Sequence, residues 1–470
     1  MMTLGDTLAL LPEILVLAGA VIGLLAGSFL PRERQAITRY VSVAALAVSA
    51  VAAAAAIAAP ASSIFAGSFA VDVATGAVRL IVPLSTIFVI VLGKEEFSGS
   101  SRESETYSLL LLSSLGAMVM AGAADLLILA GSFLLASIPL YALVGLSRKP
   151  GAAEAALKTY LIGALLGIAL LLGVTILFGI GGSTAYSTLR LTLTEAPSAA
   201  VAAGVLAVLA GLMFKAGGVP GHFWVPDATQ ASGTAVAAFL TSIPKIGAII
   251  AAYRLIDMLP PVGNWPLLIA VLATASMTLG NLAAFWQDDV RRLLGWSTVS
   301  QVGYLLLPVA VAGQATLALP SMLLYLAGYA VTNLTAFAVV AALPERRTIA
   351  DFRGAAASHP WLSLALVVSL LSLVGTPPTA VFVGKLTTFA AAWDGGLAWL
   401  VVVAAVNTVA SLFYYLRWLA PIFARNSPRS GEPSRRPWAE RATILGAVVT
   451  VTIGVTAGFV LTLFTGALTR

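Results

Sequence analysis

Two lysines, at positions 215 and 245, stand inside stretches otherwise made of residues that favour lipid. Both fall in the segment 211–255, GLMFKAGGVPGHFWVPDATQASGTAVAAFLTSIPKIGAIIAAYRL, in which apolar and small residues dominate. A lysine at the centre of a membrane-spanning helix costs about 2.5–3.5 kcal/mol on insertion scales, so it persists only with a partner, a water-filled cavity or a function. Lys215 and Lys245 therefore mark the part of the chain in which we expect ion or substrate chemistry.

A break in a helix is predicted directly after Lys215. Residues 216–221, AGGVPG, lack large side chains, and the proline has no backbone N–H, so a helix entering near residue 200 should end there. A second such site occurs much later in the chain, where GTPP at 375–378 precedes Lys385. Interrupted backbone inside a bilayer is tolerated only where protein or a hydrated cavity surrounds it, and interrupted helices mark ion or substrate sites in transporters. Lys385 is therefore a third candidate.

The composition indicates a membrane protein with many spans. Of the 470 residues, 59% are hydrophobic and 10% are charged, and the mean hydropathy is +0.98. A soluble domain has about 45–50% apolar residues. A window of about 20 residues predicts an all-α fold with roughly fourteen spanning helices. They are expected at residues 9–30, 36–58, 74–93, 106–122, 125–146, 156–181, 199–217, 233–256, 264–285, 291–312, 316–343, 361–390, 396–424 and 442–466.

The residue types present exclude several kinds of site. The sequence has no cysteine and only two histidines, His222 and His359. Disulfides, thiolate metal sites, iron–sulfur clusters and histidine-rich metal or haem sites are therefore excluded, and any redox chemistry takes place in another chain. The net charge of +6 comes from basic residues scattered among loops rather than gathered on one face, which argues against nucleic-acid binding.

Basic residues in alternate loops predict the sidedness of the chain. Arg32, Arg34 and Arg39 follow the first span, and the loop before the last span is rich in arginine between residues 425 and 441. By the positive-inside rule these loops face the cytoplasm, and both termini lie on the outer, periplasmic side. The first span lacks a basic n-region and an A-x-A cleavage site, which favours a retained helix over a signal peptide.

The two predicted breaks recur in two sets of five spans. We predict a first unit over residues 106–256 and a second over 257–424. An odd number of spans inverts the second unit relative to the first, which is the inverted-repeat pattern of secondary transporters. Residues 1–105 then form three N-terminal spans, and 425–470 form a cytoplasmic loop and a last span. The alternative is that Gly and Pro are simply commoner in membrane helices than in soluble ones.

Four further residues are weaker candidates for a proton relay. Asp125 and Asp227 lie near predicted span ends, where a solvated or topological role competes with a relay. Lys158 stands at the cytoplasmic start of a span, where it serves either topology or a relay. His222 could carry protons, since an imidazole titrates near neutrality, or it could pack beside Trp224.

A polar helix face is predicted at residues 293–306, LLGWSTVSQVGYLL. Its Ser297, Ser300 and Gln301 could hold water or could bind helices together. Glu13, in LLPEILVLAG, opens the first span, where we expect a structural role.

Stretches spread over nearly the whole chain resemble one known family. They are LLPEILVLAGA, EAALKTYLIGALL, FKAGGVPGHFWVPD, AFLTSIPKIGA, DDVRRLLGWSTVSQVGYLLL, AGYAVTNLTAFAVVA, DFRGAAASHPWLSLALVVSLLSLVGTPPTAVFVGKLTTF and VNTVASLFYYLRW. In this combination and order they are specific, and the chain resembles subunit N of bacterial NADH-quinone oxidoreductase, the antiporter-like, proton-translocating subunit of respiratory complex I. The resemblance implies fourteen helices in two inverted five-helix units, each with a broken helix. It also implies a row of buried lysines along the membrane midplane, with Lys215, Lys245 and Lys385 at the matching positions.

One position departs from the family. The family has a glutamate in its fifth helix, in a pattern like D-L-L-x-L-x-x-G-x-E-L-x-S-x-P, and DLLILAGSFLLASIP aligns to it without a gap, with Leu134 at the glutamate. The acid expected beside Lys215 is therefore missing. Either Lys215 rests uncharged or another acid substitutes, with Asp125 and Asp227 nearest in sequence. The loop after Asp227, ATQASGTA, also lacks the proline-rich, glutamate-containing turn of the family.

The leading hypothesis is a proton-translocating membrane subunit of NADH-quinone oxidoreductase in the bacterial inner membrane. The resemblance implies no cofactor in this chain, with flavin, iron–sulfur clusters and the quinone site in partner subunits. It implies contact with the lipid bilayer and with the other membrane subunits of complex I, including the other antiporter-like ones.

Several alternatives stay open. One is a subunit of a multisubunit sodium/proton antiporter or of a membrane-bound hydrogenase, although LLPEILVLAGA and VNTVASLFYYLRW favour subunit N. Another is a non-pumping structural subunit of complex I, which Leu134 favours. A solute transporter is disfavoured, because no cluster of polar groups fits an organic substrate.

Overall fold

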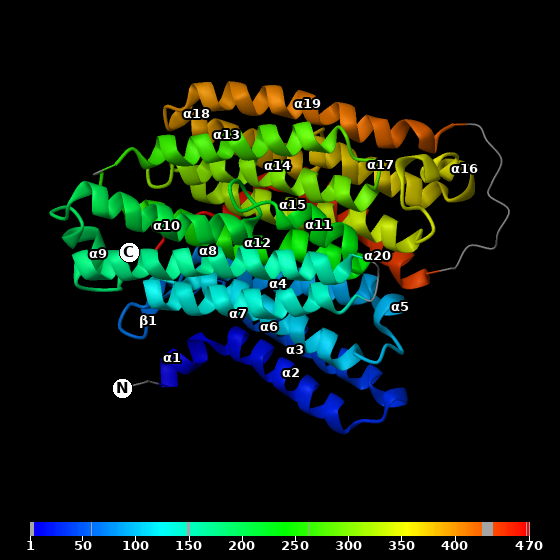
Figure 1. The fold of residues 1–470 in the computed structure, drawn as a ribbon, viewed down its shortest axis with the longest axis horizontal. Helices are drawn as coiled ribbons and strands as arrows, with labels where there is room; N and C mark the ends of the chain where they lie inside the picture. The colour runs from blue at the N-terminus through cyan, green and yellow to red at the C-terminus, as the bar shows by residue number, and fades with distance from the viewer. Residues whose placement is uncertain are drawn as a thin grey trace.

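The computed structural model describes residues 4–57, 59–147, 151–261, 263–424, 436–466 and 468–469. They form a bundle of helices that run side by side (Figure 1). The helices of the N-terminal half are α1 (Leu4–Ala9), α2 (Leu11–Phe29), the 3-10 helix η1 (Arg32–Arg34), α3 (Ala36–Ala55), α4 (Val73–Leu92), α5 (Lys94–Phe97), α6 (Glu103–Gly122), α7 (Leu126–Gly145), α8 (Ala152–Gly181), α9 (Tyr186–Thr192), α10 (Ser198–Ala216), α11 (Trp224–Ala231) and α12 (Thr234–Met258). Those of the C-terminal half are α13 (Trp265–Ala284), α14 (Val290–Ala310), α15 (Ala318–Ala342), the 3-10 helix η2 (Ile349–Phe352), α16 (Ala355–Ser358), α17 (Pro360–Val374), α18 (Ala380–Asp394), α19 (Ala398–Ile422), α20 (Pro437–Val455) and α21 (Ala457–Leu463).

The number of spans agrees with the prediction. Thirteen of the described helices are long and apolar enough to cross a membrane, and α17 and α18 together make one further, interrupted span. The prediction of an all-α, roughly fourteen-span fold with broken helices is therefore confirmed. Most of the predicted cytoplasmic loop before α20 lies outside the described residues.

A small hairpin was not predicted. Strands β1 (Ser62–Ile64) and β2 (Phe69–Val71) pair antiparallel in the loop before α4, with Ser63 opposite Ala70. In a hydropathy profile this loop appears only as a gap between two predicted spans. The hairpin leads directly into Asp72, which caps α4.

Aspartate side chains fix where three spanning helices begin. Asp72 opens α4, Asp125 opens α7 and Asp289 opens α14, and each accepts hydrogen bonds from two backbone N–H groups of the first turn. Such a cap satisfies donors that the first turn leaves free, and its charge complements the positive end of the helix dipole. These aspartates therefore set the register of the helices that follow them.

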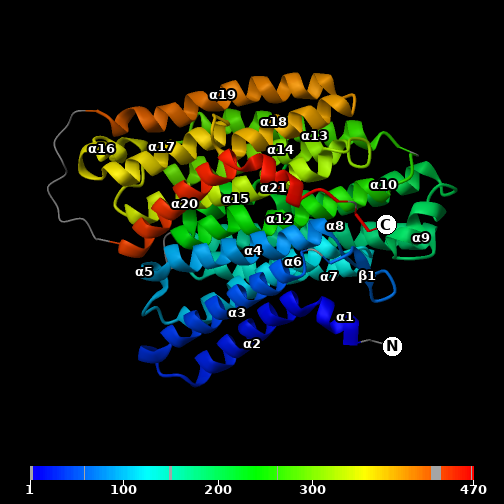
Figure 2. The same ribbon diagram turned by 180° about the vertical axis from the view of Figure 1, so that it is seen from behind.

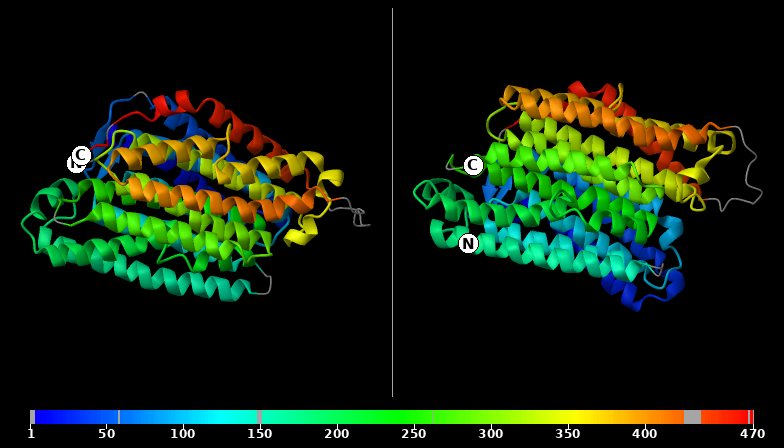
Figure 3. Two further views of the ribbon diagram at one scale, coloured as in Figure 1. Left: turned by 90° about the horizontal axis from the view of Figure 1, so that it is seen from above. Right: turned by 45° about the horizontal axis from the view of Figure 1, so that its top comes forward.

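Helices α12, α14 and α15 form the buried centre of the bundle (Figures 1 and 2). All three are buried along most of their length. Helices α2 and α3 lie at one end of the bundle and α19 at the other (Figure 1), and α8 and α20 lie on opposite flanks (Figure 3). These outer helices expose many large apolar side chains, as a lipid-facing surface requires. The chain is a multi-pass membrane protein.

Gly247 allows α12 to touch the backbone of α6. A Cβ atom added at Gly247 would stand 2.3 Å from the carbonyl oxygen of Ala117. On the preceding residue of α6, a Cβ at Gly116 would stand 2.3 Å from the backbone nitrogen of Ala136 in α7. Small residues permit such close approach between membrane helices. Helix α6 is therefore packed against backbone on two sides.

Gly247→Ala is expected to destabilise the protein by about 1–3 kcal/mol, the usual cost of overpacking. The cost falls at the upper end of that range because the obstructing atom is backbone and cannot rotate away. Thermal unfolding in detergent measures the effect. The matched control is Gly131→Ala on α7, where nothing lies within 4 Å of the added atom. Equal losses in the two variants would contradict this account of the contact.

Candidate functional site

The two breaks place Lys215 and Lys385 inside the bundle. Helix α10 ends at Gly217 (φ +79°) and α17 ends at Gly375 (φ +98°), so each break begins with a glycine in the left-handed conformation, a common way for a helix to end. Lys215 lies in the last turn before the first break, whereas Lys385 lies on α18, after the second. Both lysines are buried. The breaks lie where the sequence predicted them.

Lys385 is held by the end of the neighbouring half-helix. Its Nζ donates to the carbonyl oxygens of Leu373 (3.1 Å) and Val374 (2.9 Å), in the last turn of α17, and lies 4.0 Å from the centroid of the Tyr304 ring. The last carbonyls of a helix lack partners within the helix and carry its negative dipole end. The break at Gly375 therefore supplies acceptors that stabilise a protonated amine.

Lys245 lies in the middle of α12 and is buried. Its Nζ donates to the hydroxyl of Tyr329 at 3.3 Å. The Tyr329 hydroxyl donates in turn to the carbonyl of Thr241 at 2.8 Å and lies 3.0 Å from the hydroxyl of Thr298. Lys245 therefore touches a hydroxyl group that can pass on a proton.

Lys215 is enclosed by aromatic rings. Its Nζ lies 5.1 Å from the centroid of Phe133 and 5.8 Å from that of Phe214. Among the described residues it has no hydrogen-bond partner. Of the three lysines, Lys215 has the least support for a charge.

Neither acid that the sequence suggested as a substitute partner contacts Lys215. Asp125 caps α7 and accepts a hydrogen bond from Thr184 at 2.6 Å. Asp227 forms ion pairs with Arg292 at 2.6 Å and with Lys158 at 3.1 Å. Of the two possibilities for Lys215, the structure therefore gives no support to a substitute acid at either position.

Leu134 lies on the outward face of α7. Its exposed fraction is 42%, and Leu127 and Ile138 on the same helix are also exposed. The spacing of these three positions follows one face of a helix. The preceding residue, Phe133, is the one that faces Lys215.

The remaining candidates lie around the first break. His222, in the loop between α10 and α11, is buried, and the centroid of its ring lies 5.7 Å from that of Trp296 on α14. Its Nδ1 atom has no hydrogen-bond partner among the described residues. The Lys158 side chain is 48% exposed and also pairs with Glu154 at 2.7 Å. Burial would raise the pKa of Asp227, but its hydrogen bonds and charge interactions with Arg292 and Lys158 outweigh burial and hold this pKa below its usual range.

Polar side chains that the sequence only partly indicated lie on α14 and α15 between Lys245 and Lys385. Gln301 donates to the Leu373 carbonyl at 2.9 Å, the same oxygen that Lys385 contacts, and accepts from the Tyr325 hydroxyl at 2.6 Å. Tyr325 and Tyr329 are one turn apart on α15, and Thr298 and Gln301 are one turn apart on α14, so the two pairs face each other in register. The polar face at 293–306 pointed to Gln301. The i, i+4 spacing of the two tyrosines was the signal that could have revealed the rest.

Comparisons with known proteins show the family and the fold of the chain. Residues 123–411 match the family described as NADH:quinone oxidoreductase/Mrp antiporter, TM. The chain is 54% identical to NADH-quinone oxidoreductase subunit N of Mycobacterium sp. (strain JLS), over 95% of this chain and 96% of that protein. Its fold is similar to a chain of respiratory complex I from Thermus thermophilus, with a TM-score of 0.83 and 30% identity over 97% and 100% of the two chains. It is also similar to a chain of the Mrp complex from Dietzia sp. DQ12-45-1b, with a TM-score of 0.86 and 23% identity over 98% and 96%.

Proposed function

Because the chain belongs to the NADH-quinone oxidoreductase subunit N family, a membrane subunit of complex I, we propose that protons move through it along Lys215, Lys245 and Lys385. The observation that carries the proposal is a pair of hydrogen-bonded groups that lie next to each other on α14 and α15 between Lys245 and Lys385. Tyr329 and Thr298 form the group at Lys245, and Tyr325 and Gln301 form the group that reaches the carbonyl oxygen also contacted by Lys385.

The three lysines differ in how well they hold a proton. Lys385 has two carbonyl acceptors, Lys245 has one hydroxyl, and Lys215 faces two aromatic rings. Hydrogen bonds to the charged form favour that form. Lys385 therefore has the most acceptors for the hydrogens of a protonated amine, and Lys245 is the lysine with a hydroxyl neighbour that can exchange a proton with it.

We place the weaker candidates at the approach to Lys215. His222 lies in the break that follows Lys215, and Lys158 and Asp227 form an ion-paired cluster with Arg292 beyond it. By the positive-inside rule this cluster faces the cytoplasm and both termini face the outer side of a bacterial inner membrane. Asp125 serves as the cap of α7.

Electron transfer belongs to partner subunits in this proposal. Flavin, iron–sulfur clusters and the quinone site lie outside this chain, and NADH oxidation and quinone reduction there drive protonation changes here. The exposed apolar faces of the outer helices contact lipid and the other membrane subunits, including the antiporter-like ones.

Two other functions have some support. A subunit of a sodium/proton antiporter complex shares the fold, but the 23% identity to the Mrp chain is well below the 54% to subunit N. A structural, non-pumping subunit is favoured by Leu134 and by the lack of a polar partner for Lys215 among the described residues.

Purification from native membranes tests the assignment. A tagged chain should bring with it NADH-oxidising activity that reduces quinone, and vesicles containing the complex should acidify or alkalinise on addition of NADH. An uncoupler should collapse that gradient, and sodium should not be required. Co-purification with hydrogenase or antiporter subunits, and without NADH oxidation, would overturn the proposal.

A further inference from the structure

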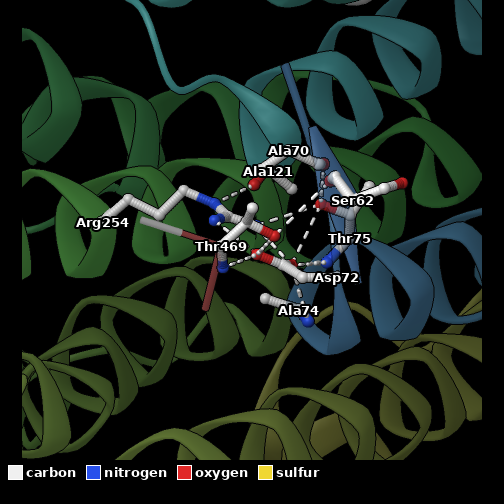
Figure 4. Close-up of polar contacts among 8 residues, drawn as sticks. All are labelled: Ser62, Ala70, Asp72, Ala74, Thr75, Ala121, Arg254 and Thr469. Carbon is white, nitrogen blue, oxygen red and sulfur yellow. Dashed lines mark hydrogen bonds and ion pairs between the residues drawn. The ribbon is translucent and has the colours of Figure 1, made fainter. Parts of the chain in front are cut away.

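The C-terminal end of α12 is anchored by a buried ion pair. Arg254 binds both carboxylate oxygens of Asp72, with Nη1 to Oδ2 at 2.8 Å and Nη2 to Oδ1 at 2.6 Å (Figure 4). Its Nε donates to the carbonyl of Ala121 at 2.6 Å. Both charged side chains are buried. Two-point pairing of this kind fixes orientation as well as distance.

Asp72 is itself fixed from several directions. It caps α4 through two backbone N–H groups, and it accepts from the backbone N–H of Thr469 at 3.0 Å. A carboxylate with this many donors stays ionised and cannot shift without losing several bonds. Arg254 is therefore bound to a rigid point.

The N-terminal end of α12 has an anchor of its own. Glu96, directly after α4 in the short helix α5, accepts from the backbone N–H of Ala235 at 3.2 Å. A Cβ atom at Gly233 would stand 1.6 Å from a carboxylate oxygen of Glu96, so the glycine leaves the space that Glu96 occupies. A carboxylate in this place stabilises the positive end of the helix.

Lys245 lies halfway between the two anchors. It is about 15 Å along the helix axis from Ala235 and about 13.5 Å from Arg254, at 1.5 Å per residue. The residue before it, Pro244, lies inside the helix and donates no backbone hydrogen bond. The helix is weakest beside Lys245, so each half follows the anchor at its own end.

The contact made by Lys245 is sensitive to small movements. The 3.3 Å distance from its Nζ to the Tyr329 hydroxyl is already at the long end for a hydrogen bond. A displacement of either half of α12 by a fraction of a turn would separate the two groups.

We propose that Asp72 and Glu96 are positioning residues for Lys245, which they hold by fixing the two ends of α12. This rests on the proposed function, since α4 and α5 would then keep α12 in place for the step of the proton path that uses Lys245. Asp72 and Glu96 act on Lys245 only through the position of α12, and neither carboxylate contacts the lysine in the described structure.

The absence of cysteine from the sequence permits a direct measure of position. Asn333 Nδ2 on α15 donates to Ser242 Oγ at 2.9 Å, and Ser242 lies one turn before Lys245 on α12. In a Ser242→Cys, Asn333→Cys pair, the rate of disulfide formation under a membrane-permeant oxidant reports where α12 lies. Asp72→Asn should lower this rate several-fold in the assembled complex.

A second buried ion pair supplies the matched control. Glu13 binds Arg79 at 2.7 Å and 2.9 Å and joins α2 to α4. Glu13→Gln makes the same change of acid to amide at a buried, two-point arginine pair. It should leave the rate of disulfide formation unchanged.

Glu96, the anchor at the N-terminal end of α12, provides a second and independent test. Glu96→Ala removes the acceptor for Ala235 and should slow disulfide formation, while Glu96→Gln keeps an acceptor and should restore most of the rate. This comparison decides the matter if Asp72→Asn fails to assemble.

Proton pumping per NADH oxidised is then measured with Ser242, Lys245 and Asn333 in place. The proposal predicts lower pumping in Asp72→Asn and Glu96→Ala than in Glu13→Gln. Equal loss of disulfide formation in Glu13→Gln, or none in either anchor variant, would overturn it. Slowed disulfide formation with full pumping would uphold the anchoring of α12 and overturn the role of Lys245 in the proposed function.

Discussion

Lys385→Ala is expected to remove most of the proton pumping that accompanies NADH oxidation, with Lys245→Ala close behind and Lys215→Ala clearly milder. Lys385 has two carbonyl acceptors for its proton, whereas the Lys215 amine lies near two aromatic rings and has no hydrogen-bond partner among the described residues. A positioned proton-transfer group contributes about 10²–10⁴-fold to the rate of its step. We therefore expect a loss of at least about tenfold at Lys385, read as the initial rate of NADH-driven acidification or alkalinisation in reconstituted vesicles.

The control for this series is Lys94→Ala. Lys94 stacks its amine 3.9 Å from the ring centroid of Trp438 on α20, outside the spanning helices, so its loss should leave pumping near the wild-type rate. Each variant must first be shown to retain the chain in the complex. If Lys385→Ala pumps normally while Lys215→Ala does not, the ranking is wrong and the protons pass through the part of the chain around Lys215.

Leu134→Glu is expected to change the pH dependence of pumping if Lys215 is an active carrier. A glutamate there restores the acid that the family places in this helix, and a carboxylate near a lysine stabilises its protonated form. If the longer glutamate side chain turns inward far enough to reach Lys215, the lysine stays charged at higher pH, and the alkaline side of the pumping profile should move up by about one pH unit or more. The reference is the profile of the unaltered complex under the same conditions.

The outward position of Leu134 determines the control that this test needs. Its side chain starts from the exposed face of α7, one residue beyond the ring that covers Lys215. Leu127→Glu puts the same charge on the same exposed face, two turns away, and serves as the matched control. A profile that moves in both variants reports only the added surface charge. A profile that moves in neither, in an assembled complex, means that a carboxylate on the outward face at position 134 does not act on Lys215.

Much of the fold followed from simple patterns in the chain. The spans could be predicted because apolar runs of about 20 residues have only one stable arrangement in lipid. The breaks could be predicted because AGGVPG and GTPP remove backbone donors and side chains at defined points. The hairpin of β1 and β2 could not, since it occupies a short stretch rich in small residues whose hydropathy resembles that of the end of a span.

The site was less accessible to the sequence, and for a physical reason. Lysines inside apolar runs stand out because their burial is costly, whereas the partners of a buried charge are fixed by packing between helices far apart in the chain. Asp72 meets Arg254 only because α4 and α12 lie together, and nothing local in either segment marks the pair. Likewise, Asp227 seemed near Lys215 by position in the chain but lies beside Arg292 instead.

The complete enclosure of α12 has a consequence for how the chain is made. This helix carries Lys245 and Arg254 and is shielded by helices that precede it and by α14 and α15, which follow it. During synthesis it enters the bilayer before its later neighbours exist, when Arg254 already has Asp72 and Ala121 but Lys245 lacks Tyr329 and faces an incomplete wall. A charge exposed to hydrocarbon is the costly state. A chain that stops before α14 therefore lacks the helices that enclose Lys245, and this enclosure is complete only once α15, which ends at Ala342, has been inserted.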